Sequence, residues 1–178
     1  IGSCYSKAKE KLDSGKMVLF TGTPCQIAGL YAFLGNKEYD KLYTVDLICH
    51  GVPSPLLFKK YLAYQEDKLK GKIVSFNFRS KEKRGWAEQY TLKTQNKSKS
   101  GAIKLDRYGK HFMDGDCYRE SCYTCPYSDI KRVSDITVGD FWGIYKSHPE
   151  FSSALGVSSV LVNTKKGQML SDSISKYA

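Results

Sequence analysis

The six cysteines are the residues of this sequence best suited to chemistry. Two of them, Cys122 and Cys125, are spaced C-x-x-C in the segment RESCYTCPY. Two thiolates at this spacing can bind one metal ion or one edge of a cluster, because the turn between them directs both sulfurs to the same side. Redox-active dithiols share the spacing, but they usually open a helix directly after a buried strand. Here the pair lies in a polar stretch with Pro126 directly behind it, which favours ligation over disulfide exchange.

Cys25 and Cys49 are candidates for the other two ligands of a four-cysteine site. Cys25 lies in TGTPCQI at the start of a predicted helix, where unpaired N–H groups and the helix dipole favour a thiolate. Cys49 ends a predicted strand, and the carboxyl ends of parallel strands meet at one edge of a sheet. We therefore expect the two thiols to lie close together, with the C-x-x-C pair completing four sulfurs. Four cysteines suit a 4Fe-4S cluster or structural zinc, and the alternative is that Cys25 and Cys49 are simply buried.

The other cysteines and His50 are weaker candidates for ligands of this site, and a nucleophilic role for Cys25 is weaker than ligation. Cys4 is expected to pack on the first helix, and Cys117, close to the pair, is the spare ligand candidate. His50 follows Cys49, and we assign it a structural role. A nucleophilic Cys25 is disfavoured, because the Cys-x5-Arg cradle of a phosphatase and the Cys-His-Asp order of a protease are both absent. The segment GTPCQIAG also lacks the Gly-Lys-Ser/Thr ending of a Walker loop.

The elements that must position Cys25 and Cys49 follow an α-β-α-β-α order. Thr23 can cap the helix that begins at Pro24, a position where the missing N–H of proline does no harm. In chain order we predict a helix over residues 3–14, a strand over 16–20, a helix from 24 to the stop at 35–36, a strand over 41–49 and a helix from 55 onward. Helices that alternate with strands favour parallel pairing in an α/β layer.

The second half of the chain has a different pattern. Val74, Phe76 and Phe78 alternate with polar residues, which predicts a half-buried strand. The other predicted segments are strands over 88–94 and 102–105 joined by a turn over 96–101, an irregular stretch over 108–132, strands over 135–143 and 157–163, and a helix over 165–177. We therefore predict a mixed α/β fold in a single domain over residues 1–178: a partly parallel sheet with flanking helices, and a β-rich half that bears cysteines.

The net charge indicates possible binding partners, and the start of the chain indicates what kind of protein it belongs to. The net charge is +10, and basic residues concentrate in residues 68–85 and 93–110. This pattern fits a solvated lysine surface, an anionic ligand such as a dinucleotide or a polyglutamate tail, nucleic acid, or acidic partner domains that are missing from this fragment. No apolar run is long enough to cross a membrane, and no secretory leader opens the chain. We expect a cytoplasmic protein. The chain begins at Ile1 rather than Met, so we also expect it to be a fragment of a longer protein whose N-terminal part is missing.

Five ordered motifs resemble the C-terminal domain of the coenzyme F420 hydrogenase/dehydrogenase beta-subunit family: VLFTGTPCQIAGL, VDLICHGVPSP, FNFRSKEKRGW, RESCYTCPY and SDITVGDFWG. The resemblance covers about residues 1–165 and implies FAD and a 4Fe-4S cluster as cofactors. It implies cluster ligation by Cys25, Cys49, Cys122 and Cys125. It also implies flavin contacts at Thr21, Gly22, Thr23, Gln26, Arg79, Lys81, Trp86, Gly139 and Asp140.

Elementary chemistry supports several of these flavin contacts. A glycine turn at a helix start offers N–H groups to a phosphate or a flavin carbonyl. Arg79 and Lys81 can neutralise a pyrophosphate, and Trp86 can stack on a ring or serve as an ordinary core aromatic. Asp140 could equally be a helix cap. No side chain is assigned as a catalytic acid or base.

The resemblance implies an iron–sulfur flavoprotein oxidoreductase that passes electrons between a 4Fe-4S cluster and FAD, and on to a two-electron acceptor such as coenzyme F420, a nicotinamide or a small substrate. Complete family members often carry an N-terminal ferredoxin-like domain, but no C-x2-C-x2-C run occurs here. The expected electron partner is therefore a ferredoxin-like domain or a donor subunit, with no membrane partner and nucleic acid disfavoured. The alternative function is a non-enzymatic module, stabilised by zinc or a cluster, whose basic face binds nucleic acid or an acidic partner.

Overall fold

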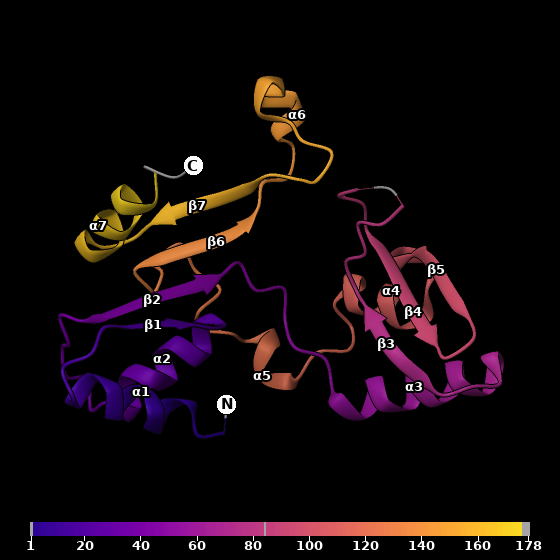
Figure 1. The fold of residues 1–178 in the computed structure, drawn as a ribbon, viewed down its shortest axis with the longest axis horizontal. Coiled ribbons are helices and arrows are strands. Elements are labelled where there is room, and N and C mark those ends of the chain that lie inside the picture. Colours follow the sequence, from indigo (N-terminus) through magenta and orange to yellow (C-terminus); the bar gives the residue numbers. More distant parts are fainter. Residues whose placement is uncertain (1, 84, 176–178) are drawn as a thin grey trace. The chain divides into compact units, whose positions relative to one another are not determined.

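The computed structural model describes residues 2–83 and 85–175 and divides them into two compact units (Figure 1). The parallel-sheet unit contains residues 2–49, 126–142 and 158–175. The antiparallel unit contains residues 50–83, 85–125 and 143–157. The chain passes from one unit to the other directly after Cys49 and again directly after Cys125. That residues 1–178 act as a single domain stays a prediction.

Four strands form the sheet of the parallel-sheet unit, in the order β1-β2-β6-β7. Its elements are β1 (Val18–Thr21), β2 (Leu42–Leu47), β6 (Ile136–Asp140), β7 (Ser158–Val162), α1 (Cys4–Asp13), α2 (Pro24–Phe33) and α7 (Lys165–Ile174). β1, β2 and β6 run parallel, whereas β7 pairs with β6 in the antiparallel direction. The predicted α/β class and the parallel pairing of the first two strands are confirmed.

α1 and α2 lie beside β1 and β2 (Figure 1), and a buried, mainly aliphatic core packs between these elements. Alternate side chains of a strand point to the same face, so Val18 and Phe20 both pack against this core. Leu30 of α2 and Leu42 of β2 are almost fully buried within it. Burial of each such leucine stabilises the fold by about 1.5–3 kcal/mol. This packing holds the carboxyl ends of β1 and β2 side by side.

The antiparallel unit is built around a three-stranded sheet of order β3-β4-β5. Its elements are α3 (Pro55–Leu69), β3 (Ile73–Asn77), β4 (Gln89–Thr94), β5 (Ser98–Ala102), the 3-10 helix η1 (Ile103–Leu105), α4 (Arg107–Asp114), α5 (Glu120–Tyr123), α6 (Ile144–Ser147) and the 3-10 helix η2 (Pro149–Phe151). Aromatic rings fill the space between the sheet and α3. The ring centroid of Phe76 lies 5.4 Å from that of Phe58 and 4.5 Å from that of Phe78.

The hairpin between β4 and β5 is tighter than the sequence predicts. The backbone N–H of Thr94 donates to the carbonyl oxygen of Lys97 at 2.8 Å, and only residues 95–97 separate β4 from β5. Residues 98–101, predicted as a turn, therefore belong to β5, and residues 103–105, predicted as a strand, form η1. Both predictions are wrong because the Ser- and Lys-rich composition resembles a turn, whereas ladder hydrogen bonds come from the backbone and require no apolar side chain.

An irregularity in β3 changes which side chains reach the core. The register with β4 shifts between Ile73 and Ser75. As a result Ile73 and Phe76 both pack against the core, whereas Val74 is 62% exposed. The prediction that Val74 shares a face with Phe76 is therefore wrong, because an inserted residue reverses the alternation of the strand.

The stretch 108–132 is more regular than predicted, since α4 occupies its first part. The side chain of Asp106 caps this helix by accepting hydrogen bonds from the backbone N–H groups of Tyr108 and Gly109 at 3.1 and 3.0 Å. Gly115 follows the helix with a left-handed φ of +79°. The aspartate cap and the terminal glycine are both standard sequence signals that identify this helix.

Candidate functional site

The turn from β1 into α2 is locked by the side chain of Gln26. Its Oε1 accepts a hydrogen bond from the backbone N–H of Thr23 at 2.9 Å, which satisfies a free donor at the helix start. The same side chain covers Gly22, where an added Cβ would lie only 2.8 Å from Oε1. Gly22 in turn donates its N–H to the carbonyl of Val45 at 3.1 Å, which joins the turn to β2. Gln26, predicted to contact a flavin, therefore has a structural task at the helix start.

Cys25 is exposed at the second position of α2. Its Sγ lies 3.1 Å from Oγ1 of Thr23, a hydrogen bond in which either group can donate. Cys4 is also exposed, so the prediction that it packs is wrong. Burial raises the pKa of Tyr5, and the neighbouring thiols of Cys25 and Cys4 add to this effect. Cys25 is accessible to a ligand and is not the buried small hydrophobe of the alternative interpretation.

Cys49 is exposed and follows the end of β2, at the same sheet edge as Cys25. The register of the strands establishes this, because Thr21 of β1 is the partner of Val45, and Leu47 is the partner of Val138 in β6. The carboxyl ends of β1, β2 and β6 consequently meet at one edge. This edge is where ligands bind in parallel α/β sheets.

Gly139 and Asp140 close β6 at the same edge. The side chain of Ile48 lies over Gly139, where an added Cβ would be 2.7 Å from its Cδ1. The backbone N–H of Ile48 also donates to the carbonyl of Val138 at 2.9 Å. Gly139 is thus required for the close packing of the residue that precedes Cys49, whatever else binds there.

A buried ion pair that the sequence analysis missed lies beneath this edge. Nη2 of Arg132 is 3.1 Å from Oδ1 of Asp46, with only 9% and 0% of the two side chains exposed. The guanidinium also donates to backbone carbonyls, at 3.1 Å for Leu47 and 3.2 Å for Tyr127. Asp46 lies two residues after Thr44 and four after Leu42, so all three side chains face inward from β2. This two-residue period is the sequence signal that could have identified Asp46 as buried.

In the antiparallel unit, the chain that follows Cys49 pairs with the chain that precedes the C-x-x-C pair. The backbone N–H of Arg119 donates to the carbonyl of Val52 at 2.9 Å, and Pro53 and Tyr118 form an antiparallel bridge. The ring of Tyr118 also lies 5.6 Å from that of His50. His50 therefore packs against an aromatic ring in the cysteine-bearing segment, in line with its predicted structural role.

The three cysteines of this unit are partly buried. Cys122 lies in the short helix α5, and its N–H donates to the carbonyl of Arg119 at 2.8 Å. Burial raises the pKa of the Cys117 thiol, and the carboxylate of Asp116 raises it further. A raised pKa disfavours the thiolate, the form that binds metal, which counts against Cys117 as a ligand.

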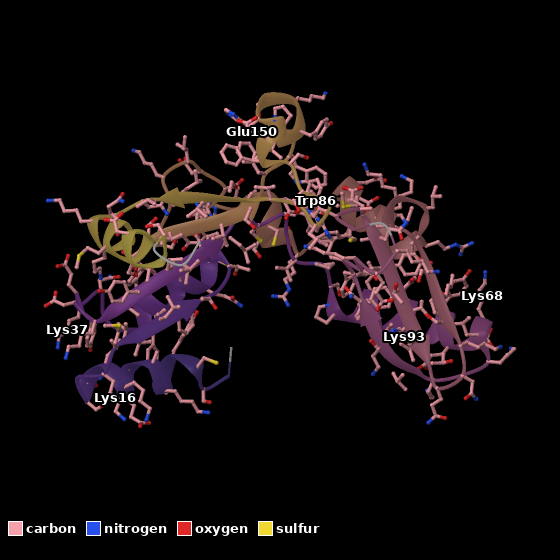
Figure 2. The ribbon with its side chains drawn as sticks, turned by 45° about the horizontal axis from the view of Figure 1, so that its top comes forward. Lys16, Lys37, Lys68, Trp86, Lys93 and Glu150 are labelled. Atoms are coloured by element: carbon pink, nitrogen blue, oxygen red, sulfur yellow. The ribbon has the colours of Figure 1, made fainter. Side chains whose placement is uncertain are left out.

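Arg79, Lys81 and Trp86 all lie in the antiparallel unit, and their shared role in one site stays a prediction (Trp86 in Figure 2). The guanidinium of Arg79 lies 5.9 Å from the ring centroid of Trp86. The Trp86 ring covers Gly156, where a Cβ would be 2.4 Å from Cδ1, and Lys81 donates to the carbonyl of Leu155 at 2.6 Å.

Arg79 also lines a cavity of about 450 Å³ within the antiparallel unit. The walls include Phe78, Tyr108, Phe112 and Met113, and Glu88 is the other charged residue of the lining. A mainly apolar, aromatic cavity with a few charged groups has the character of a site for a flat organic ring. Its volume lies within the range of small-molecule sites in proteins.

The thirteen predicted site residues are therefore divided between the two units. The parallel-sheet unit holds Thr21, Gly22, Thr23, Cys25, Gln26, Cys49, Gly139 and Asp140, and the antiparallel unit holds Arg79, Lys81, Trp86, Cys122 and Cys125. Within either unit as described, no three His, Cys, Asp or Glu side chains converge as the ligands of a metal ion would. The chemistry of the cysteines fits a cluster or zinc, but each unit contributes only two of the four.

Comparisons with known proteins give a similar solved structure and a matching family model. Comparison with curated proteins gives no match. Among solved structures, a chain of the xenon-derivatised F420-reducing NiFe hydrogenase complex from Methanosarcina barkeri is similar, with a TM-score of 0.53 and 18% identity. The likeness covers 96% of the present chain but 53% of the hydrogenase chain, so our chain spans about half of that length. At this identity the likeness shows the fold.

No helix within residues 2–83 and 85–175 has both the length and the hydropathy needed to cross a membrane.

A family model for the C terminus of the beta subunit of coenzyme F420 hydrogenase/dehydrogenase matches residues 15–177. The chain therefore belongs to this family and corresponds to the C-terminal domain of its beta subunits.

Proposed function

We propose that this chain is the C-terminal domain of an iron–sulfur flavoprotein oxidoreductase. Cys25, Cys49, Cys122 and Cys125 bind a 4Fe-4S cluster, and FAD contacts the remaining predicted site residues. Electrons pass between the two groups and on to a two-electron acceptor, with coenzyme F420 the first candidate because of the family. Membership of a family of hydrogenase and dehydrogenase subunits supports the redox function.

The observation that carries the proposal is how the chain on each side of Cys49 is held. In the parallel-sheet unit, one guanidinium binds the carbonyl of Leu47, two residues before Cys49, and that of Tyr127, two residues after Cys125. In the antiparallel unit, Val52, three residues after Cys49, accepts from Arg119, three residues before Cys122. Within each unit, the chain beside Cys49 is thus bonded to the chain beside the cysteine pair, so each unit orders segments next to proposed ligands.

The chemistry of each group sets the tasks of the chain. A cluster exchanges single electrons and a flavin exchanges one or two, so the protein must bind and orient both groups and exclude water. The exposed Cys25 at the start of α2 is suited to bind iron as a thiolate, because the helix dipole favours negative charge there. We propose that the protein works in the cytoplasm, where cysteines stay reduced and available to bind iron.

The flavin part of the proposal depends on Arg79 and Trp86. Their proximity, beside a cavity with aromatic walls, supports a site for a ring system with a neighbouring anionic group. We propose further that the chain works as one domain of a longer polypeptide, and that a ferredoxin-like domain or a donor subunit exchanges electrons with it.

Anaerobic reconstitution with iron and sulfide tests the cluster assignment. We expect about four iron atoms per chain and a broad visible absorbance from the wild type. Cys25→Ser, Cys49→Ser, Cys122→Ser and Cys125→Ser should each lose most of both signals. Cys4→Ser and Cys117→Ser are the matched controls and should retain them, since neither cysteine is among the proposed ligands.

Two outcomes would overturn this assignment. Loss of iron in the two control variants but not in the four ligand variants would reject the ligand set. Zinc at about one atom per chain, with no visible absorbance and no flavin uptake, would favour the metal-stabilised binding module instead.

A further inference from the structure

We infer that Arg132 and Asp46 are a positioning pair for the cluster ligands, a role that rests on the proposed function. Arg132 ties the chain before Cys49 to the chain after Cys125, and Asp46 supplies the charge that allows a guanidinium to be buried there. Neither residue is a proposed ligand. The pair acts through the two backbone segments that it holds.

The hydrogen bonds of Arg132 reach two separate parts of the chain. Nη2 donates to the carbonyl of Leu47 at 3.1 Å, and Nη1 donates to the carbonyls of Tyr127 and Asp129 at 3.2 and 3.3 Å. Nε donates to Oγ1 of Thr137 at 3.2 Å, in the strand next to β2. A planar guanidinium has five N–H groups in a fixed fork, so one side chain can hold all these acceptors in a set geometry.

Asp46 neutralises the charge of Arg132 but does not itself hold a backbone segment. Its nearest oxygen is 3.1 Å from Nη2 of Arg132, close enough for an ion pair, but neither carboxylate oxygen receives a hydrogen bond from the described residues. Both side chains are almost completely buried. The carboxylate therefore neutralises the guanidinium without directing it, and the carbonyls of Leu47 and Tyr127 direct it instead.

Because the two residues have different tasks, variants can distinguish a role of the pair in positioning the ligands from a role in fold stability alone. Arg132→Lys keeps a positive charge beside Asp46, but an ammonium cannot reproduce the planar fork toward both segments. A double variant, Asp46→Asn with Arg132→Met, removes both charges, and removal of a whole buried pair is tolerated better than removal of one member. If the pair only stabilises the fold, iron binding should recover whenever stability recovers.

The experiment uses the reconstituted chain of 178 residues. Thermal melting of the iron-free protein reports folding, and the rate of iron release to a chelator reports how firmly the ligands are held. We expect Arg132→Lys to melt near the wild-type temperature but to release iron about tenfold faster, the size of effect seen for outer residues of metal sites. The double variant should melt above Arg132→Met and still release iron rapidly.

Lys166→Met is the matched control, because it also removes a cation that binds two backbone carbonyls of this unit. Lys166 donates to Tyr39 and Leu42 at 3.3 and 3.0 Å, around the other end of β2. The Lys166→Met variant should have a lower melting temperature than the wild type and release iron at the wild-type rate. If the wild type binds iron but Arg132→Lys releases it at the wild-type rate, the positioning role is rejected and the proposed function stands. If the wild type binds no iron, both are rejected.

Discussion

The ring of Tyr118 lies directly over the α-carbon of Gly51, so that a Cβ at residue 51 would meet its Cδ2 at 2.6 Å. Gly51 also has a φ of +133°, a conformation that side chains of L-residues rarely adopt. The contact joins the second residue after Cys49 to the segment that leads into Cys122. Glycine is required at residue 51 both for its conformation and for the space that the ring occupies.

Gly51→Ala should destabilise the protein by about 3 kcal/mol, because backbone strain and the clash with Tyr118 add. Urea denaturation measures this change. Gly35→Ala is the control, since Gly35 has a φ of +69° but open space around its α-carbon, and it should lose only about 1 kcal/mol. Equal losses in the two variants would show that the contact with Tyr118 contributes nothing.

Arg79→Gln should weaken FAD binding about tenfold, the effect expected when a charge-assisted hydrogen bond to an anionic ligand is lost. Lys83→Gln, in the same basic loop, removes the same unit of charge without touching the Arg79–Trp86 contact. Equilibrium dialysis with FAD compares the two dissociation constants. If both variants weaken binding equally, net charge alone attracts the flavin, and Arg79 has no specific contact with it.

Cys117 is partly buried and should react with iodoacetamide more slowly at pH values near 8 than the exposed Cys4, because burial limits access to its sulfur and raises the pKa of its thiol. The reaction rate of Cys117 should therefore continue to rise at pH values above its ordinary pKa of 9.0. Peptide mass spectrometry of the iron-free protein measures both rates. In denaturant the two rates should converge, and a persistent difference would point to a cause other than the fold.

Tyr61→Phe should change how stability depends on alkaline pH. Tyr61 donates to Oδ2 of Asp106 at 2.7 Å, and burial, followed by this hydrogen bond, raises its pKa above the ordinary value of 10.0. A raised pKa in the folded state gives stability that is complete below pH 10.0 and declines as pH rises further. Tyr61→Phe should lose about 1 kcal/mol near neutral pH and decline less steeply in alkali.

Tyr64→Phe, on the same helix α3, should change the alkaline pH dependence of stability in the opposite direction. A hydrogen bond with Lys68 lowers the pKa of Tyr64, so ionisation of this residue favours the folded state in alkali. Its removal should therefore steepen the alkaline decline, whereas removal of Tyr61 should flatten it. Urea denaturation over a series of alkaline pH values distinguishes the two, and parallel curves for both variants would contradict the assignment.

The regular features of the fold were predictable from local sequence. Helix periodicity, the Thr23–Pro24 start of α2 and the alternation of helices with strands predicted α1, β1, α2, β2 and α3, and the class of the fold is confirmed. These signals succeed because caps, breakers and hydrophobic periods act over a few neighbouring residues. The hairpin register and the irregularity of β3 were missed, because they depend on pairing between segments, which composition does not record.

By itself, the sequence determined the order of the first five elements, from α1 to α3, the spacing of the cysteines and the family motifs. Only the tertiary structure decided that Cys25 and Cys49 are exposed and that Arg132 is buried against Asp46. The reason is physical. A charged or polar residue has the same local signature whether it faces water or a distant partner, and only the packing of remote segments distinguishes the two.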